Sequence, residues 1–175
     1  MRKTLLAATM VGALGASTTA IAADDYIPLG GWQLLVSTDA MTDMSRSIAA
    51  ATGSGGSLGV KCDGEGTNEM YIIFASDQYL GGGRSPRRPI MVRFDQDTPE
   101  YWTFYIDKSI AMITNAAQVN KFAARIVNTR KLTLRLTDYE GAYVDAVIDT
   151  ADGKEALERA YKACGQTAPW AAATP

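Results

Sequence analysis

The sequence predicts a β-rich α+β domain: a sandwich-like antiparallel sheet arrangement with two packed helices and one disulfide. Three observations lead to this class. Most apolar residues recur with a period of two in short segments separated by Gly, Pro, Asn and Asp, which is typical of half-buried strands. Two segments show helical spacing instead, and both cysteines lie in a region that we expect to be exported.

Period-two alternation predicts six strands. On the fourth, Trp102, Phe104 and Ile106 fall on one face, and Tyr101 and Tyr105 fall on the other, where we expect solvent. The last two strands form a hairpin whose turn spans residues 139–142. The predicted strands cover residues 32–38, 68–75, 90–95, 101–106, 131–137 and 142–150.

Helical spacing predicts two helices, each with an apolar stripe facing the core. Asp152 is expected to cap the second helix, with Glu155 three residues later, and Gly165 to end it. The stripes are Val119, Phe122, Ala123, Ile126 and Val127 in the first helix, and Ala156, Leu157, Ala160, Tyr161 and Cys164 in the second.

Two segments between the first predicted strands are less regular. Residues 43–52 fit either a short helix or an irregular strand, because propensity alone does not decide between them. The Gly/Ser run at residues 53–57 is predicted to be a surface loop.

The N-terminus has the order of a secretory signal. Arg2 and Lys3 precede an apolar stretch and then the small residues that end at Ala22. A retained membrane helix is the alternative, but the apolar stretch is too short for a hydrocarbon core of ~30 Å. We expect a signal peptide at 1–22, a single β-rich domain at 23–165 and a flexible tail at 166–175.

Size and charge exclude several classes of protein. Cleavage after Ala22 leaves 153 of the 175 residues, which suits one domain with one core. The loss of Arg2 and Lys3 changes the net charge from −2 to −4, which disfavours a nucleic-acid partner. No later segment is apolar enough to enter a bilayer. We therefore expect a protein that is periplasmic or secreted, with no integral membrane segment after cleavage.

Cys62 and Cys164 are the two cysteines of the chain. An oxidising compartment would let them pair, so we predict a disulfide between them; two separate buried thiols are the alternative. The bond would close a loop of about 100 residues, for which the chain-entropy model gives ~4.7 kcal/mol.

Arg84, Arg87 and Arg88 form the most distinctive local feature, because they are concentrated in the Gly- and Pro-rich segment 81–89. Guanidinium groups bind carboxylates and phosphates in two-pronged fashion. The segment is therefore the candidate partner-binding site, for an acidic patch on another protein, lipid head groups or an anionic wall polymer. The alternative is a solvated loop that only keeps the protein soluble.

Aromatic residues suggest a second surface. Tyr79, Tyr101, Trp102 and Tyr105 could form a platform for a sugar or a protein if the tyrosines share an exposed face. The alternative is that Tyr101 and Tyr105 are ordinary outer residues of a sheet.

The chain has no histidine, which removes the commonest general base and metal ligand. Asp95, Asp97 and Glu100 lie close together, as a carboxylate hydrolase would need, but three acids in a turn are more often a solvated connection. Ser57 lies in a G-x-S-x-G string without the strand before it and helix after it that a nucleophile needs. We expect no catalytic residue, no enzyme activity and no cofactor.

Calcium ligands are the metal-site candidate. Asp63, Glu65, Asn68 and Glu69 cluster after Cys62 and offer the oxygen donors that calcium prefers. They lack the order of a calcium loop and also fit a polar turn, so no metal is expected.

The order of landmarks resembles the VasI-like (TagO-like) family of accessory proteins of type VI secretion systems and related uncharacterised periplasmic proteins. The resemblance spans nearly the whole mature chain. It consists of Trp32 opening a strand, Met41-Thr42-Asp43, Leu58-Gly59-Val60-Lys61-Cys62, Val92-Arg93-Phe94-Asp95 before Trp102, Phe122 in a helix, Leu132-Thr133-Leu134-Arg135, and the segment from Ala156-Leu157 to Cys164.

The resemblance implies a β-rich periplasmic domain with an accessory or binding role, and it brings no catalytic residues. The Gly/Ser run at 53–57 and the long arginine segment depart from the family's pattern. We expect a non-enzymatic accessory or protein-binding module of the cell envelope, with an envelope protein as partner. The alternative is an inhibitor or recognition protein for a cell-wall-active enzyme or glycan.

Overall fold

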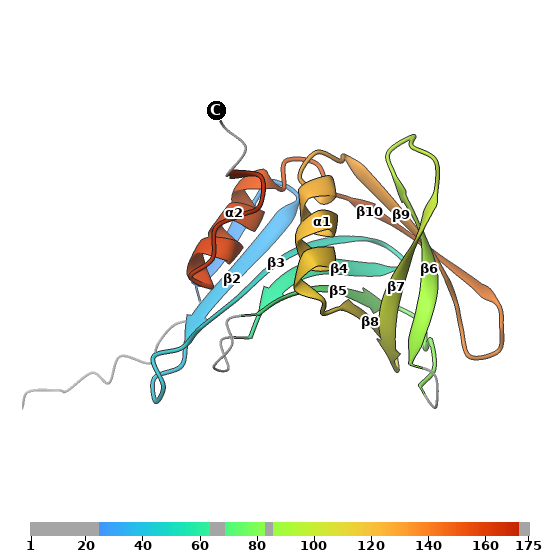
Figure 1. Ribbon diagram of the computed structural model, residues 1–175, viewed down its shortest axis with the longest axis horizontal. Helices are drawn as coiled ribbons and strands as arrows, with labels where there is room; N and C mark the ends of the chain where they lie inside the picture. Colours follow the sequence, from blue (N-terminus) through green and yellow to red (C-terminus); the bar gives the residue numbers. More distant parts are fainter. Residues whose placement is uncertain (1–24, 64–68, 83–85, 172–175) are drawn as a thin grey trace, which may run out of the picture.

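The computed structural model describes residues 25–63, 69–82 and 86–171. The predicted signal peptide lies outside these residues. Within them the chain forms ten strands and two helices (Figure 1). The elements are β1 (Asp25–Leu29), β2 (Trp32–Thr38), β3 (Ser45–Ser54), β4 (Gly56–Cys62), β5 (Met70–Ser76), β6 (Arg87–Phe94), β7 (Glu100–Asp107), β8 (Ile110–Ile113), α1 (Ala116–Ile126), β9 (Lys131–Thr137), β10 (Tyr143–Asp149) and α2 (Lys154–Ala163).

Eight of the strands form a closed antiparallel barrel, so the predicted sandwich is wrong. They follow the order β3, β4, β5, β8, β7, β6, β9 and β10, and β10 pairs back onto β3. This closing contact joins Val147 to Ser54 and Ile148 to Gly53. Period-two alternation shows only that each strand buries one face, a pattern that sandwiches and barrels share.

Glycines at the end of β3 allow the barrel to close. A Cβ atom on Gly53 would collide with the carbonyl oxygen of Val147, and one on Gly55 would lie 2.6 Å from the carbonyl oxygen of Asp145. The Gly/Ser run is thus the tight hairpin between β3 and β4, not the predicted surface loop. Most of residues 43–52, which fitted either a helix or a strand, belong to β3.

β1 and β2 form a hairpin that extends the sheet beyond the barrel. β2 pairs with β3 from Ser45 to Ala51, and α2 packs against both strands. The N-cap of α2 is Gly153 and not the predicted Asp152. A Cβ on Gly153 would lie 2.5 Å from the indole nitrogen of Trp32, so the helix begins where a glycine permits close packing.

The predicted disulfide between Cys62 and Cys164 is present, and its Cα atoms are 6.0 Å apart. It joins the end of β4 to the C-cap residue of α2. The bond therefore ties the helix to the barrel wall and joins two cysteines that are 102 residues apart in the sequence.

Helix α1 contributes to the core through Phe122. The centroid of its ring lies 4.8 Å from the ring centroid of Trp102, 5.3 Å from that of Phe94 and 6.0 Å from that of Phe104. These contacts hold α1 against β6 and β7, and other contacts of the helix reach β5. Figure 1 shows α1 between these walls of the barrel, with α2 beside β2.

Residues 166–171 of the segment predicted as a tail have a defined place. The indole nitrogen of Trp170 donates a hydrogen bond to Glu158 on α2 at 3.0 Å, and its ring meets the edge of Tyr161. Among the described residues, no helix has the length and apolar character needed to cross a membrane.

Candidate partner-binding groove

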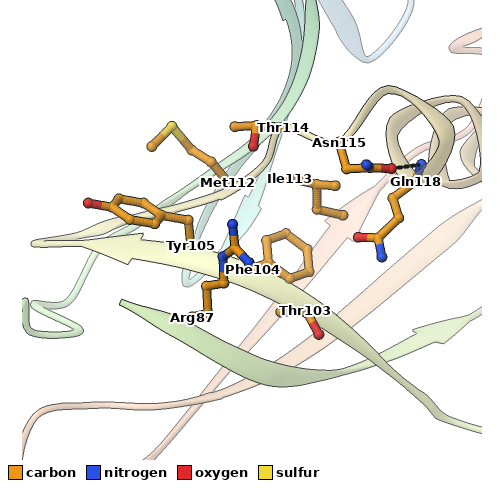
Figure 2. Close-up of a pocket in the computed structure, with 9 residues that line it drawn as sticks. All are labelled: Arg87, Thr103, Phe104, Tyr105, Met112, Ile113, Thr114, Asn115 and Gln118. Carbon is orange, nitrogen blue, oxygen red and sulfur yellow. Dashed lines mark hydrogen bonds between the residues drawn. The ribbon is translucent and has the colours of Figure 1, made fainter. Parts of the chain in front are cut away.

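A groove of about 290 Å³ lies between β7, the end of β8 and the start of α1 (Figure 2). We call it the β7–α1 groove. Most of its surface is polar, and its lining includes hydroxyl, amide, aromatic and guanidinium groups. The lining residues are Arg87, Thr103, Phe104, Tyr105, Met112, Ile113, Thr114, Asn115 and Gln118.

The groove exists because β8 is short. β8 pairs with β7 only as far as Met112 opposite Tyr105, after which the chain turns away to start α1. Asn115 caps that helix, since its side-chain oxygen accepts a hydrogen bond from the backbone N–H of Gln118 at 3.1 Å. The first turn of α1 therefore stands next to β7 and leaves a gap along this strand.

Arg87 supplies the charge of the groove. It lies on β6 directly across from Tyr105, and its side chain is exposed. Figure 2 shows the guanidinium directed into the groove between the side chains of Tyr105 and Phe104. No ion pair between described residues involves Arg87, and it is the only charged residue among the nine that line the groove.

The other two predicted arginines are placed differently. Arg88 points to the opposite side of β6, where its Nη1 donates to the carbonyl oxygens of Leu80 at 3.1 Å and Thr137 at 3.3 Å. It fixes the chain before β6 to the end of β9. Arg84 lies outside the described residues. Of this set, only Arg87 lines the β7–α1 groove, whereas Arg88 lines a separate pocket beside the end of β9.

The predicted aromatic platform is divided. Tyr101 and Tyr105 are exposed on the outer face of β7, as their alternation predicts, whereas Trp102 is buried beneath α1. Tyr79 lies apart from them and meets the edge of Tyr139, with 5.5 Å between the ring centroids. Only Tyr105 contributes to the groove.

The three clustered carboxylates all have structural partners. Asp95 accepts hydrogen bonds from the backbone N–H groups of Arg130 and Lys131. Arg125 on α1 bridges the other two, with 2.9 Å to Asp97 and 2.7 Å to Glu100. These contacts hold the β6–β7 turn against the helix. A turn of this kind is the solvated connection that the sequence favours over a hydrolase site.

Asp63 and Glu69 are the two calcium-ligand candidates that the structure describes; Glu65 and Asn68 lie outside the described residues. Asp63 forms an ion pair with Lys61, and Glu69 is exposed. In the described ranges, no three His, Cys, Asp or Glu residues are grouped so that they could hold a metal ion.

Sequence reasoning missed most of the groove, including Thr103, Asn115 and Gln118. Asn115 carries the one usable signal, because an asparagine directly before a helical pattern is a common N-cap. That signal locates the junction of β8 and α1. It does not reveal that the junction faces β7.

Comparisons of the chain with protein-family models, with curated proteins and with solved structures found no match. The resemblance to the VasI-like family therefore stays a prediction.

Proposed function

We propose that this chain is an exported, non-enzymatic accessory protein of the cell envelope that binds another protein through the β7–α1 groove. The observation that carries the proposal concerns Arg87. Its guanidinium is directed into a polar groove, and it forms no ion pair with any described residue. An arginine that the fold does not use is available to a carboxylate of a partner.

Two further features support this role. The disulfide between Cys62 and Cys164 suits an oxidising compartment, either the periplasm or the exterior. The resemblance to the VasI-like family implies the same kind of role, as an accessory protein of a type VI secretion system. These two features support an accessory role in the cell envelope, whereas Arg87 indicates which surface of the protein binds the partner.

Recognition of a glycan, including that of a cell-wall component, is the second candidate. The exposed ring of Tyr105 and the hydroxyl and amide groups of Thr103 and Gln118 favour it. Sugars are bound by such combinations of an aromatic face and polar side chains.

Site-specific photo-crosslinking tests the proposal. A photoreactive residue replaces Gln118 in the groove. In the control protein it replaces Lys162 on the exposed side of α2. Each protein is irradiated in its own cell envelope. We expect one defined protein adduct from position 118 and none of that mass from position 162. Arg87→Glu should abolish the adduct, and Arg130→Glu, beyond the far end of α1, should leave it unchanged.

Other outcomes contradict the proposal. Equal adducts from positions 118 and 162, or an adduct that survives Arg87→Glu, would place the partner elsewhere. An adduct that glycan-degrading enzymes remove would favour the glycan candidate.

A further inference from the structure

We infer that an extended, acidic segment of the partner adds to the free edge of β7 as a short β-strand, with one of its carboxylates bound by Arg87. This inference rests on the proposed function, because it specifies how a protein partner occupies the same groove.

The backbone of β7 presents an open edge to the groove. The N–H of Ile106 donates to the carbonyl oxygen of Pro86, just before β6, at 2.6 Å. In an antiparallel ladder, alternate residues bond to the same neighbour, so the backbone groups of Tyr101, Thr103 and Tyr105 point to the other side. On that side β8 pairs with Tyr105 and goes no further toward Thr103.

The register shows which position a partner would occupy. If β8 continued, Thr114 would lie opposite Thr103, because Met112 lies opposite Tyr105. Instead, Thr114 turns toward α1 and lines the groove. Among the described residues no strand pairs with Thr103 or Tyr101 on this side. A strand placed there would satisfy these backbone groups and continue the line of β8.

Charge selects an acidic segment. In a ladder, a residue opposite Thr103 projects to the same side of the sheet as Thr103, which is the exposed, outer side. Arg87 projects from that side as well, and its guanidinium enters the same groove. A carboxylate opposite Thr103 would meet this guanidinium, and no acidic side chain of the lining would repel it.

The geometry favours a peptide over a glycan as occupant. The backbone groups of Thr103 and Tyr101 repeat at about 7 Å along the strand, which is the spacing of alternate residues in an extended chain. A peptide reproduces this repeat, and a sugar chain does not. The groove, at about 290 Å³, lies near the lower end of ligand-pocket volumes, so the paired part of the segment is short.

A blocked synthetic peptide tests the mode of binding. The probe is acetyl-Thr-Val-Asp-Val-Thr-amide, and its control carries Asn in place of Asp. Amide NMR of the mature protein should show shifts and slowed hydrogen exchange at Thr103 and Tyr101. The Asn peptide, or Arg87→Gln, should weaken binding about tenfold or more, because each removes a charge-assisted hydrogen bond. Arg130→Gln should have no effect.

Two results would overturn the inference: unchanged exchange at Thr103 and Tyr101 at saturating peptide concentration, or equal affinity of the Asp and Asn peptides. A uronic-acid oligosaccharide that shifts these amides when the peptide does not would assign the groove to a glycan.

The inference and the proposed function can fail separately. An Arg87-dependent adduct at position 118 without protection of the β7 amides leaves the binding module intact and removes strand addition. Absence of that adduct removes the function itself.

Discussion

The phenol of Tyr161 on α2 donates a hydrogen bond to the side-chain oxygen of Asn120 on α1, with 3.1 Å between the oxygen atoms. Tyr161 is completely buried, and burial raises the pKa of its phenol to about 12. The bond joins two helices that cover different parts of the sheet.

The stability of the protein should therefore fall above pH 10. Between the ordinary pKa of 10.0 and the raised value of about 12, the unfolded chain loses the Tyr161 proton while the folded chain keeps it. The free energy of unfolding must then decrease as the pH rises through this window, by about 1–2 kcal/mol. Denaturant unfolding of the wild type and of Tyr161→Phe between these two pH values measures the decrease in the free energy of unfolding. The variant should lose less stability, and parallel losses would contradict the prediction.

Removal of the disulfide should destabilise the fold strongly. The variant with both Cys62→Ala and Cys164→Ala releases a loop whose ends are 102 residues apart, for which the chain-entropy model gives about 4.7 kcal/mol. Urea unfolding measures the loss, and wild-type protein under reductant is the matched comparison. A loss below about 1 kcal/mol in both would mean that packing alone holds α2 against β4.

The elements could be predicted where the pattern is local. The alternation of Trp102, Phe104 and Ile106 with tyrosines predicts β7 and its outer face correctly, and the stripe around Phe122 predicts α1. The strand β8 cannot be predicted in this way, because four residues are too few to show a period.

Closure of the barrel could not be predicted in this way. It depends on Gly53 meeting Val147, which is far away in the sequence, and glycines next to serine have the local appearance of a linker.

Arg125 should stabilise the fold by joining α1 to the β6–β7 turn. Its guanidinium bonds to Asp97 and Glu100 and lies 4.0 Å from the ring centroid of Phe94. Arg125→Met keeps an apolar stem but removes these contacts, so we expect a loss of about 1–2 kcal/mol. The side chain of Arg130 is exposed, so Arg130→Met should lower the free energy of unfolding by less than about 0.5 kcal/mol in the same urea titration. Equal losses would mean that the three contacts of Arg125 add nothing.

The candidate site was only partly accessible from the sequence. The arginine-rich segment contributes one residue, Arg87, to the groove that we propose as the binding site. Its neighbour Arg88 instead bonds to the carbonyl oxygens of Leu80 and Thr137, and composition cannot separate two adjacent arginines on opposite faces of a strand. The rest of the groove comes from β7, the end of β8 and the start of α1, whose arrangement around a gap depends on the fold.

Gly53→Ala should open the barrel where β10 meets β3. The new methyl group would overlap the carbonyl oxygen of Val147, and because that atom is backbone, the strands themselves must move. We expect a loss of at least about 3 kcal/mol, at the upper end for overpacking. Gly31→Ala is the matched control, since nothing lies within 4 Å of its added Cβ. Hydrogen exchange should accelerate at the closing residues Val147 and Ile148 in Gly53→Ala only. If these residues stay protected in that variant, β3 and β10 tolerate a side chain between them.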